Sequence, residues 1–92
     1  SKESPHYEWT TEISLQEIEN TLMKKYQRLG KIRSISFKKF NDRVVEVAII
    51  HSNGNLVLTG NQFRLLLDPS KLKSTFFTAK LNKKSFHIYG KG

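Results

Sequence analysis

Arg64 stands in the setting that most suggests chemistry in this chain. It is the only charged residue between Glu46 and Asp68, and it lies in the most apolar part of the sequence. A charge there is costly unless it is paired or binds something. One interpretation is a buried structural arginine that bonds to loop carbonyls and a carboxylate, with Asp68 one helical turn on as the candidate partner. The other is an arginine that orients a carboxylate or glycan hydroxyls at a cleft, and the residues alone leave both open.

The other residues of catalytic type show no pattern of an enzyme site. His6, His51 and His87 are far apart and the chain has no cysteine, so a zinc site is not expected. Glu17 and Glu19 cannot share one face of a helix, which argues against a carboxylate pair. The chain also has no nucleophile elbow and no glycine-rich phosphate loop. We therefore predict no catalytic residue, no metal and no cofactor.

Charge is divided unevenly along the chain, which carries +8 in total at pH 7. Residues 1–20 contain one lysine against five glutamates, a net of −4, whereas residues 21–92 contain fifteen Lys and Arg against three acids, a net of +12. A field of that sign attracts polyanions: nucleic acid, anionic lipid or an anionic cell-wall glycan. Ordinary solubility is the alternative explanation of the charge.

A small basic nucleic-acid-binding module is the alternative function that the composition allows. Lysines with interleaved aromatic residues favour it, but the chain lacks the aromatic ribonucleoprotein strand motif, a recognition helix and a Gly-x-x-Gly clamp. The lysines within 38–39, 71–73 and 83–84 fall at predicted turns, where a solvated charge costs least. We therefore keep this function as the alternative and do not expect nucleic acid as a partner.

The length of 92 residues allows one domain at most, so we treat 1–92 as a single unit with a flexible lead-in over 1–6. Hydrophobic residues make up 37% of the chain, which is enough for a packed core. No stretch approaches the ~20 consecutive apolar residues that a membrane span needs. We expect no membrane span in this chain.

The clearest predicted element is a long amphipathic helix over about 14–29. Its apolar residues recur at steps of three and four, namely Leu15, Ile18, Leu22, Tyr26 and Leu29. Ser14 and Glu17 form a capping box at its start, and Gly30 is expected to close its end. A short helix is predicted over about 61–67, next to Arg64.

Alternating apolar residues predict strands in the rest of the chain. The expected ranges are Tyr7–Ile13, Ile32–Phe40, Val44–Ile50, Leu56–Thr59, Phe77–Leu81 and Phe86–Ile88. The third of these is apolar on both faces except at Glu46, which predicts a central strand covered on both sides. Asn41-Asp42 predicts a turn, and Asn53-Gly54 predicts a type I′ hairpin. The fold class is α+β: a mostly antiparallel sheet with one long helix and one short helix.

Several short blocks occur in an order that resembles a known family. Arg43-Val44 opens an apolar strand, Gly-x-x-Phe-Arg follows at Gly60–Arg64, and Leu-Lys-Ser-Thr-Phe-Phe follows at Leu72–Phe77. The last block, Phe86–Gly92, reads Phe-His-Ile-Tyr-Gly-Lys-Gly. Together with the strand and capped helix before them, these blocks resemble the C-terminal half of the SpoIID/LytB domain family, the stage II sporulation protein D and amidase-enhancer group. The resemblance runs from about Tyr7 to the end of the chain.

The resemblance implies a bacterial cell-envelope protein, extracytoplasmic, that acts on peptidoglycan. Some members of the family are lytic transglycosylases that cleave glycan strands stripped of their stem peptides, and others enhance amidases. The family's catalytic glutamate lies in an N-terminal, alanine-rich helical half that no segment of this chain resembles. The chain also ends before the family's Trp-Gly-His-Gly block. We therefore expect a C-terminal portion that binds glycan or serves as scaffold and is inactive by itself.

The expected partners are peptidoglycan glycan strands and, as a third possibility, another cell-envelope protein docked on a sheet edge or on the long helix. We expect Arg64 to brace the segment Ser74–Phe77 and to shape one wall of a glycan cleft. The residues implied by the resemblance as glycan-binding or cleft-shaping are Arg64, Gln62, Ser74, Thr75, Phe76, His87, Tyr89 and Lys91.

Overall fold

The computed structural model describes residues 8–91, which form six strands and two helices. In chain order the elements are β1 (Glu8–Ser14), α1 (Leu15–Lys25), β2 (Ile32–Phe40), β3 (Arg43–His51), β4 (Gly54–Thr59), α2 (Gly60–Leu67), β5 (Phe77–Asn82) and β6 (Ser85–Lys91). All strand pairs are antiparallel, which confirms the α+β class and the predicted antiparallel pairing. The predicted lead-in over 1–6 and the expected strand start at Tyr7 lie outside the described residues.

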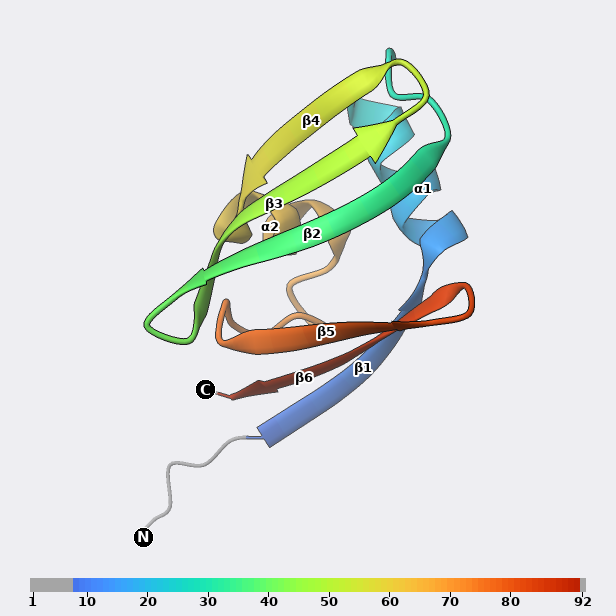
Figure 1. Ribbon diagram of the computed structural model, residues 1–92. Coiled ribbons are helices and arrows are strands. Elements are labelled where there is room, and N and C mark those ends of the chain that lie inside the picture. The colour runs from blue at the N-terminus through green and yellow to red at the C-terminus, as the bar shows by residue number, and fades with distance from the viewer. Residues whose placement is uncertain (1–7, 92) are drawn as a thin grey trace, which may run out of the picture.

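The strands form two sheets of three strands each. One has the order β1-β6-β5 and the other the order β2-β3-β4. Figure 1 shows the two sheets one above the other, with α1 beside them and α2 behind the β2-β3-β4 sheet. The helix α2 packs against β3, β4 and α1. Because β1 pairs with β6, the final block of the sequence lies beside the N-terminal strand.

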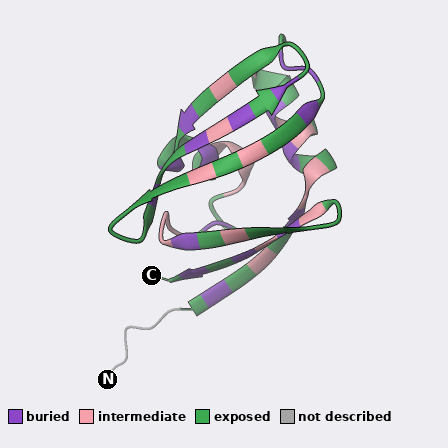
Figure 2. Ribbon diagram, viewed as in Figure 1, coloured by how far each residue is buried: buried purple, intermediate pink, exposed green. Residues whose placement is uncertain are grey.

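Aromatic side chains join the two sheets. Phe37 of β2 makes edge-on ring contacts with Phe63 of α2, Phe77 of β5 and Phe86 of β6, at centroid distances of 5.7, 5.9 and 5.8 Å. Edge-to-face pairs of this kind add to the stabilisation from burial alone. Figure 2 shows that buried residues alternate with exposed ones along the strands, as expected for sheets with one face in the core. The core therefore lies between the sheets and under α2.

The prediction of a long helix over 14–29 is wrong about the length of the helix. The helix α1 begins after Ser14, whose hydroxyl accepts the Glu17 backbone N–H at 3.0 Å, but it ends at Lys25. Beyond it Leu29 is buried in the core, and the backbone N–H of Gly30 donates to Nδ1 of His51 at 3.0 Å. The chain leaves the helix early because these residues dock on the β3–β4 hairpin, a contact that periodicity does not reveal.

The turn predicted at Asn41-Asp42 is confirmed, and the type I′ geometry lies there rather than at Asn53-Gly54. Asn41 and Asp42 both have positive φ angles, 51° and 65°, which is the signature of a type I′ turn between β2 and β3. Among the described non-glycine residues Asn53 has no positive φ, so the type I′ turn predicted at Asn53-Gly54 is wrong. There the strands are joined through Ser52 and Asn53, and Gly54 opens β4 at a φ of 141°.

The strand β3 is central in its sheet, as predicted, but it is not covered on both sides. Val47 and Ile49 are fully buried, whereas Val45 is 40% and Ile50 is 46% exposed. On the β2 side the outward residues of β3 pair with small or polar residues, for example Ile50 with Ser34, whereas on the β4 side Ala48 pairs with Val57, which is 57% exposed. The sequence of β3 is apolar on both faces, but the outward face of this sheet lies open in the described residues. The prediction that β3 is covered on both sides is therefore wrong.

Candidate functional site

One surface hollow brings together side chains from three separate parts of the chain. It is lined by Arg43 at the start of β3, by Asn61 and Arg64 of α2, and by the segment 73–76 that precedes β5. Its volume is about 250 Å³. Arg43, Arg64 and Lys73 are its cations, and no Asp or Glu lines it. We call this site the cationic hollow.

The start of α2 is fixed against β3 and so sets one wall of the cationic hollow. The Thr59 hydroxyl accepts the Gln62 N–H at 3.0 Å, and the Gln62 side chain accepts the Thr59 N–H at 2.9 Å, a complete capping box. A Cβ on Gly60 would lie 1.9 Å from the carbonyl oxygen of Val44, so only glycine lets the helix approach this closely. Gln62, a predicted cleft residue, thus has its side chain engaged in helix capping.

Another wall is the segment 73–76, and hydrogen bonds tie its residues 74–76 to both sheets. The carbonyl of Thr75 accepts the N–H of Val44 at 2.8 Å, at the start of β3. The carbonyl of Phe76 accepts the N–H of Lys91 at 2.9 Å, at the end of β6. The Ser74 hydroxyl donates to the Lys91 carbonyl and accepts the Phe76 N–H. The wall is therefore held by backbone groups, and the Ser74 hydroxyl is already engaged.

Arg64 is partly buried and lacks a full set of partners. Its Nη1 donates to Oδ1 of Asn61 at 3.4 Å, whereas its buried Nε has no hydrogen-bond partner among residues 8–91. An unpaired buried donor costs about 1–3 kcal/mol. Asp68, the predicted partner, instead accepts from the Ser70 N–H at 2.9 Å and the Ser70 hydroxyl at 2.6 Å. The pair with Asp68 is therefore wrong, and no described hydrogen bond from Arg64 braces Ser74–Phe77.

Arg43 is held over an aromatic ring rather than against an acid. Its guanidinium carbon lies 4.3 Å from the centroid of the Phe76 ring, within the range of a cation–π contact. Stacking leaves the N–H groups at the edges of the guanidinium plane free to donate. The ion pairs found between described side chains, Lys71 with Glu17 and His87 with Glu12, include none of the three cations of the hollow.

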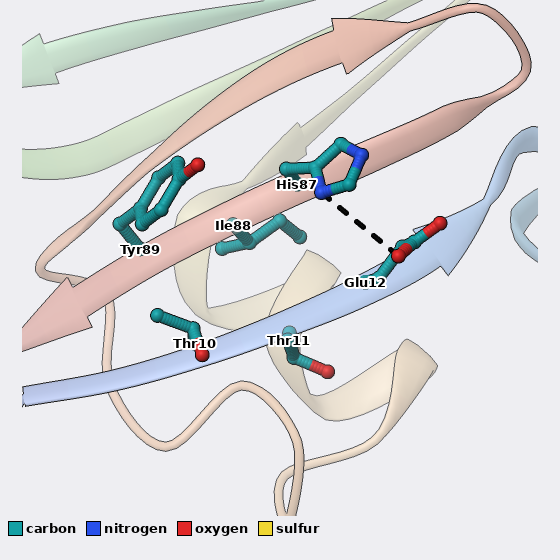
Figure 3. Close-up of a pocket in the computed structure, with 6 residues that line it drawn as sticks. All are labelled: Thr10, Thr11, Glu12, His87, Ile88 and Tyr89. Carbon is teal, nitrogen blue, oxygen red and sulfur yellow. Dashed lines mark ion pairs between the residues drawn. The ribbon is translucent and has the colours of Figure 1, made fainter.

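The predicted residues of β6 lie on a different surface, the solvent-exposed side of the β1-β6-β5 sheet, which we call the outer face. Figure 3 shows His87 and Tyr89 projecting from the same side of β6, with His87 turned toward Glu12 of β1. His87 Nδ1 lies 3.9 Å from Oε1 of Glu12, and Tyr89 is 51% exposed. A hollow of about 360 Å³ between them is also lined by Thr10.

The structure thus divides the predicted site residues among different places. Arg64, Ser74, Thr75 and Phe76 line the cationic hollow; His87 and Tyr89 lie on the outer face; Lys91 lines a neighbouring hollow with Tyr89; and Gln62 caps α2. Residue-level prediction missed Arg43, Asn61 and Lys73. Arg43 had a usable signal, because the Arg43-Val44 block was one of those that carried the family resemblance, but nothing local placed it beside Arg64.

The histidines show no metal-binding arrangement among residues 8–91, where no group of three His, Asp or Glu side chains could hold an ion. His51 is buried, and its Nδ1 accepts the N–H of Gly30 at 3.0 Å and that of Asn53 at 3.3 Å. Both bonds require Nδ1 to be unprotonated. His51 is therefore a structural residue that joins the end of the α1–β2 connection to the β3–β4 turn, while His6 lies outside the described residues.

Comparison with known proteins adds no identification: no protein-family model matches the chain, and no curated protein matches it. None of the described helices is long and apolar enough to cross a membrane. The features that bear on function are therefore the geometry of the cationic hollow and the order of the sequence blocks around it.

Proposed function

We propose that this chain is the C-terminal portion of a SpoIID/LytB-type domain that acts on bacterial peptidoglycan outside the cytoplasm. In the full-length protein the activity is that of a lytic transglycosylase on glycan strands without stem peptides, or of an amidase enhancer. The residues of this chain bind the glycan and position it, and the acid that performs the chemistry belongs to the N-terminal half of such a domain.

The observation that carries the proposal is the convergence of separate sequence blocks on one hollow. Arg43 comes from the first block, Arg64 from the second and the 73–76 wall from the third. The fourth block contributes the Lys91 backbone, which holds that wall. Blocks that merely build a core have no need to meet at the surface. Their meeting around a cationic hollow supports a shared binding role.

The charge distribution supports the same proposal. The net charge of +12 over residues 21–92 draws the chain toward polyanionic cell wall, and the cationic hollow is a place where that attraction becomes local contact. Glycan strands without stem peptides expose lactyl carboxylates, which are anions of the kind that arginine recognises.

The experiment is a pull-down of the chain with purified sacculi stripped of stem peptides, at moderate salt. We expect the wild-type chain to be retained and the Arg43→Gln/Arg64→Gln variant to be released. The matched control is Lys38→Gln/Lys80→Gln, which removes the same charge from exposed positions outside the hollow. Loss of binding in the control as large as in the arginine variant would show that the site is not specific.

Nucleic-acid binding stays the alternative function, because a cluster of cations in one hollow also suits phosphate. Titration of the chain with oligonucleotides at several salt concentrations separates the two functions. Tight binding with a steep salt dependence, unaffected by competing denuded glycan, would replace the peptidoglycan proposal.

A further inference from the structure

The cationic hollow has an excess of positive charge that the described part of the protein leaves uncompensated. Arg43, Arg64 and Lys73 line it without a carboxylate, and Asp68, which follows Arg64 by one turn, is bonded to Ser70 instead. Like charges brought together in this way repel one another. An anion in the hollow would remove that repulsion.

The guanidinium of Arg64 points to the kind of anion. Nη1 donates one of its two N–H groups to Oδ1 of Asn61 at 3.4 Å, whereas Nε is buried without a partner and Nη2 makes no hydrogen bond within residues 8–91. Nε and Nη2 form the side edge of the guanidinium, which pairs with two oxygens of a carboxylate or phosphate once the side chain turns so that the buried Nε faces the hollow. Buried polar groups without partners are rare in folded proteins, and a bound ion is one of their recognised explanations.

Arg43 offers a second guanidinium in a fixed orientation. The Phe76 ring holds it from one side at 4.3 Å, and no acid competes for its N–H groups in the described ion pairs. A flexible surface arginine must lose side-chain entropy on binding, whereas a stacked one has lost part of it already. The guanidinium groups of Arg43 and Arg64 line the same hollow. This arrangement favours the binding of one oxyanion between them over a general attraction of polyanions to the surface.

The size of the hollow limits what enters it. A volume of about 250 Å³ lies below the usual range of pockets that enclose a whole small-molecule ligand. It fits one charged substituent of a larger chain. The Ser74 hydroxyl donates its hydrogen bond to the Lys91 carbonyl. The groups that recognise the ligand are therefore the two arginines and Lys73.

We propose that the cationic hollow is an oxyanion subsite in which Arg43 and Arg64 together bind one carboxylate or phosphate group of a cell-wall polymer. This inference rests on the proposed function for the identity of the polymer. Two sources share the chemistry: the lactyl carboxylate of muramic acid in a denuded glycan strand, and the phosphate of an anionic wall polymer. The proposed function favours the carboxylate.

The test is an NMR titration of the whole chain that follows the arginine side-chain Nε–H signals. The probes are N-acetylmuramic acid, N-acetylglucosamine as its match without the carboxylate, and inorganic phosphate. We expect N-acetylmuramic acid to shift the Arg64 and Arg43 signals in a saturable way, with a Kd on the order of millimolar. N-acetylglucosamine should leave both signals in place. Saturation by phosphate alone would retain the subsite and assign it to a phosphate polymer.

The Arg64→Lys variant keeps the charge but loses the fork, and should weaken N-acetylmuramic acid binding about tenfold. Lys73→Gln changes an exposed residue, so it tests the hollow even where an arginine variant fails to fold. Lys80→Gln is the charge control and should bind as the wild type does.

Equal shifts with N-acetylglucosamine, or no shift at either arginine with any anion, would overturn the inference. Its failure is separable from failure of the proposed function. Sacculus binding that persists in Arg43→Gln/Arg64→Gln removes the subsite and leaves a glycan-binding chain. Saturable anion binding without any retention on sacculi removes the peptidoglycan assignment and leaves the subsite.

Discussion

The cationic hollow and the outer face of the β1-β6-β5 sheet differ in whether acidic residues lie beside their basic residues. On the outer face, strand register sets Glu12 opposite His87 and Glu8 opposite Lys91, so acids and bases are neighbours. In the hollow, Arg43 and Arg64 come from different elements and meet no acid. The outer face therefore has acids of its own beside its basic residues, whereas the described residues bring no acid to the lining of the hollow. This difference is why we assign binding to the hollow.

The largest effect should come from removing the guanidinium groups on one side of this comparison only. Arg43→Gln/Arg64→Gln should lower affinity for denuded glycan strands about a hundredfold, since each charge-assisted contact contributes roughly tenfold or more. Glu12→Gln/His87→Gln changes the outer face and should leave affinity unchanged. Binding measured by calorimetry with both variants checks the assignment, and a larger loss in the outer-face variant would reverse it.

Gly60→Ala should disrupt the cationic hollow by displacing α2, without changing any residue that lines it. The added Cβ would meet the Val44 carbonyl oxygen at 1.9 Å, so α2 must move away from β3 at a cost of about 1–3 kcal/mol in unfolding free energy. Gly90→Ala is the counterpart under the outer face, where the Cβ would meet the Trp9 ring at 2.0 Å.

Denaturant unfolding should show that both glycine variants are destabilised. Among molecules that stay folded, Gly60→Ala should lose more glycan retention than Gly90→Ala, which lies next to Lys91 but does not set the position of α2. If Gly90→Ala loses retention to the same degree, the two regions are not independent.

His51 provides a stability test away from both regions. Its unprotonated Nδ1 accepts from Gly30 and Asn53, so His51→Ala leaves two backbone donors without that acceptor and should cost about 1–3 kcal/mol. His51→Asn offers an amide oxygen near the same place and should recover part of the loss. Chemical denaturation measures both, with glycan binding unchanged; equal stability of Ala and Asn variants would remove the role given to Nδ1.

The smallest effect concerns Asp68, beside the hollow but not part of its lining. Hydrogen bonds from the Ser70 hydroxyl and then the Ser70 N–H hold the pKa of the Asp68 carboxyl below its ordinary value. A lowered pKa means that the folded state prefers the ionised form, so this small stabilisation is present above the unfolded pKa and is lost as pH falls through the folded one. Ser70→Ala should raise the pKa of Asp68, as read by carboxyl NMR titration; an unchanged pKa would contradict the assignment.

Local sequence signals predicted the presence of the eight elements but not all of their ends. The alternation in Ile32–Phe40 gave β2 with its bounds, and the apolar run near Phe63 gave α2. The end of α1 at Lys25 could not be predicted, because it depends on the docking of Leu29 and Gly30 against the β3–β4 hairpin. Helical periodicity continues through the same residues whether or not that contact forms.

The candidate site could be predicted only in part for a similar reason. Arg64 was identifiable as a charge in an apolar stretch, and Ser74, Thr75 and Phe76 through the family resemblance. Arg43 joins them because the Val44 N–H bonds to the Thr75 carbonyl, a contact between segments far apart in the sequence. Whether a charge is compensated is likewise a tertiary property, which composition and spacing do not report.

The most direct test of the central claim is co-sedimentation of the chain with denuded glycan strands whose lactyl carboxylates are either intact or chemically reduced to alcohols. Both polymers have the same sugar backbone, so only the anion differs. Retention on intact strands and release from reduced strands, with Lys80→Gln behaving as the wild type, is the predicted result. Equal retention on the two polymers would contradict the claim that the cationic hollow binds a glycan carboxylate.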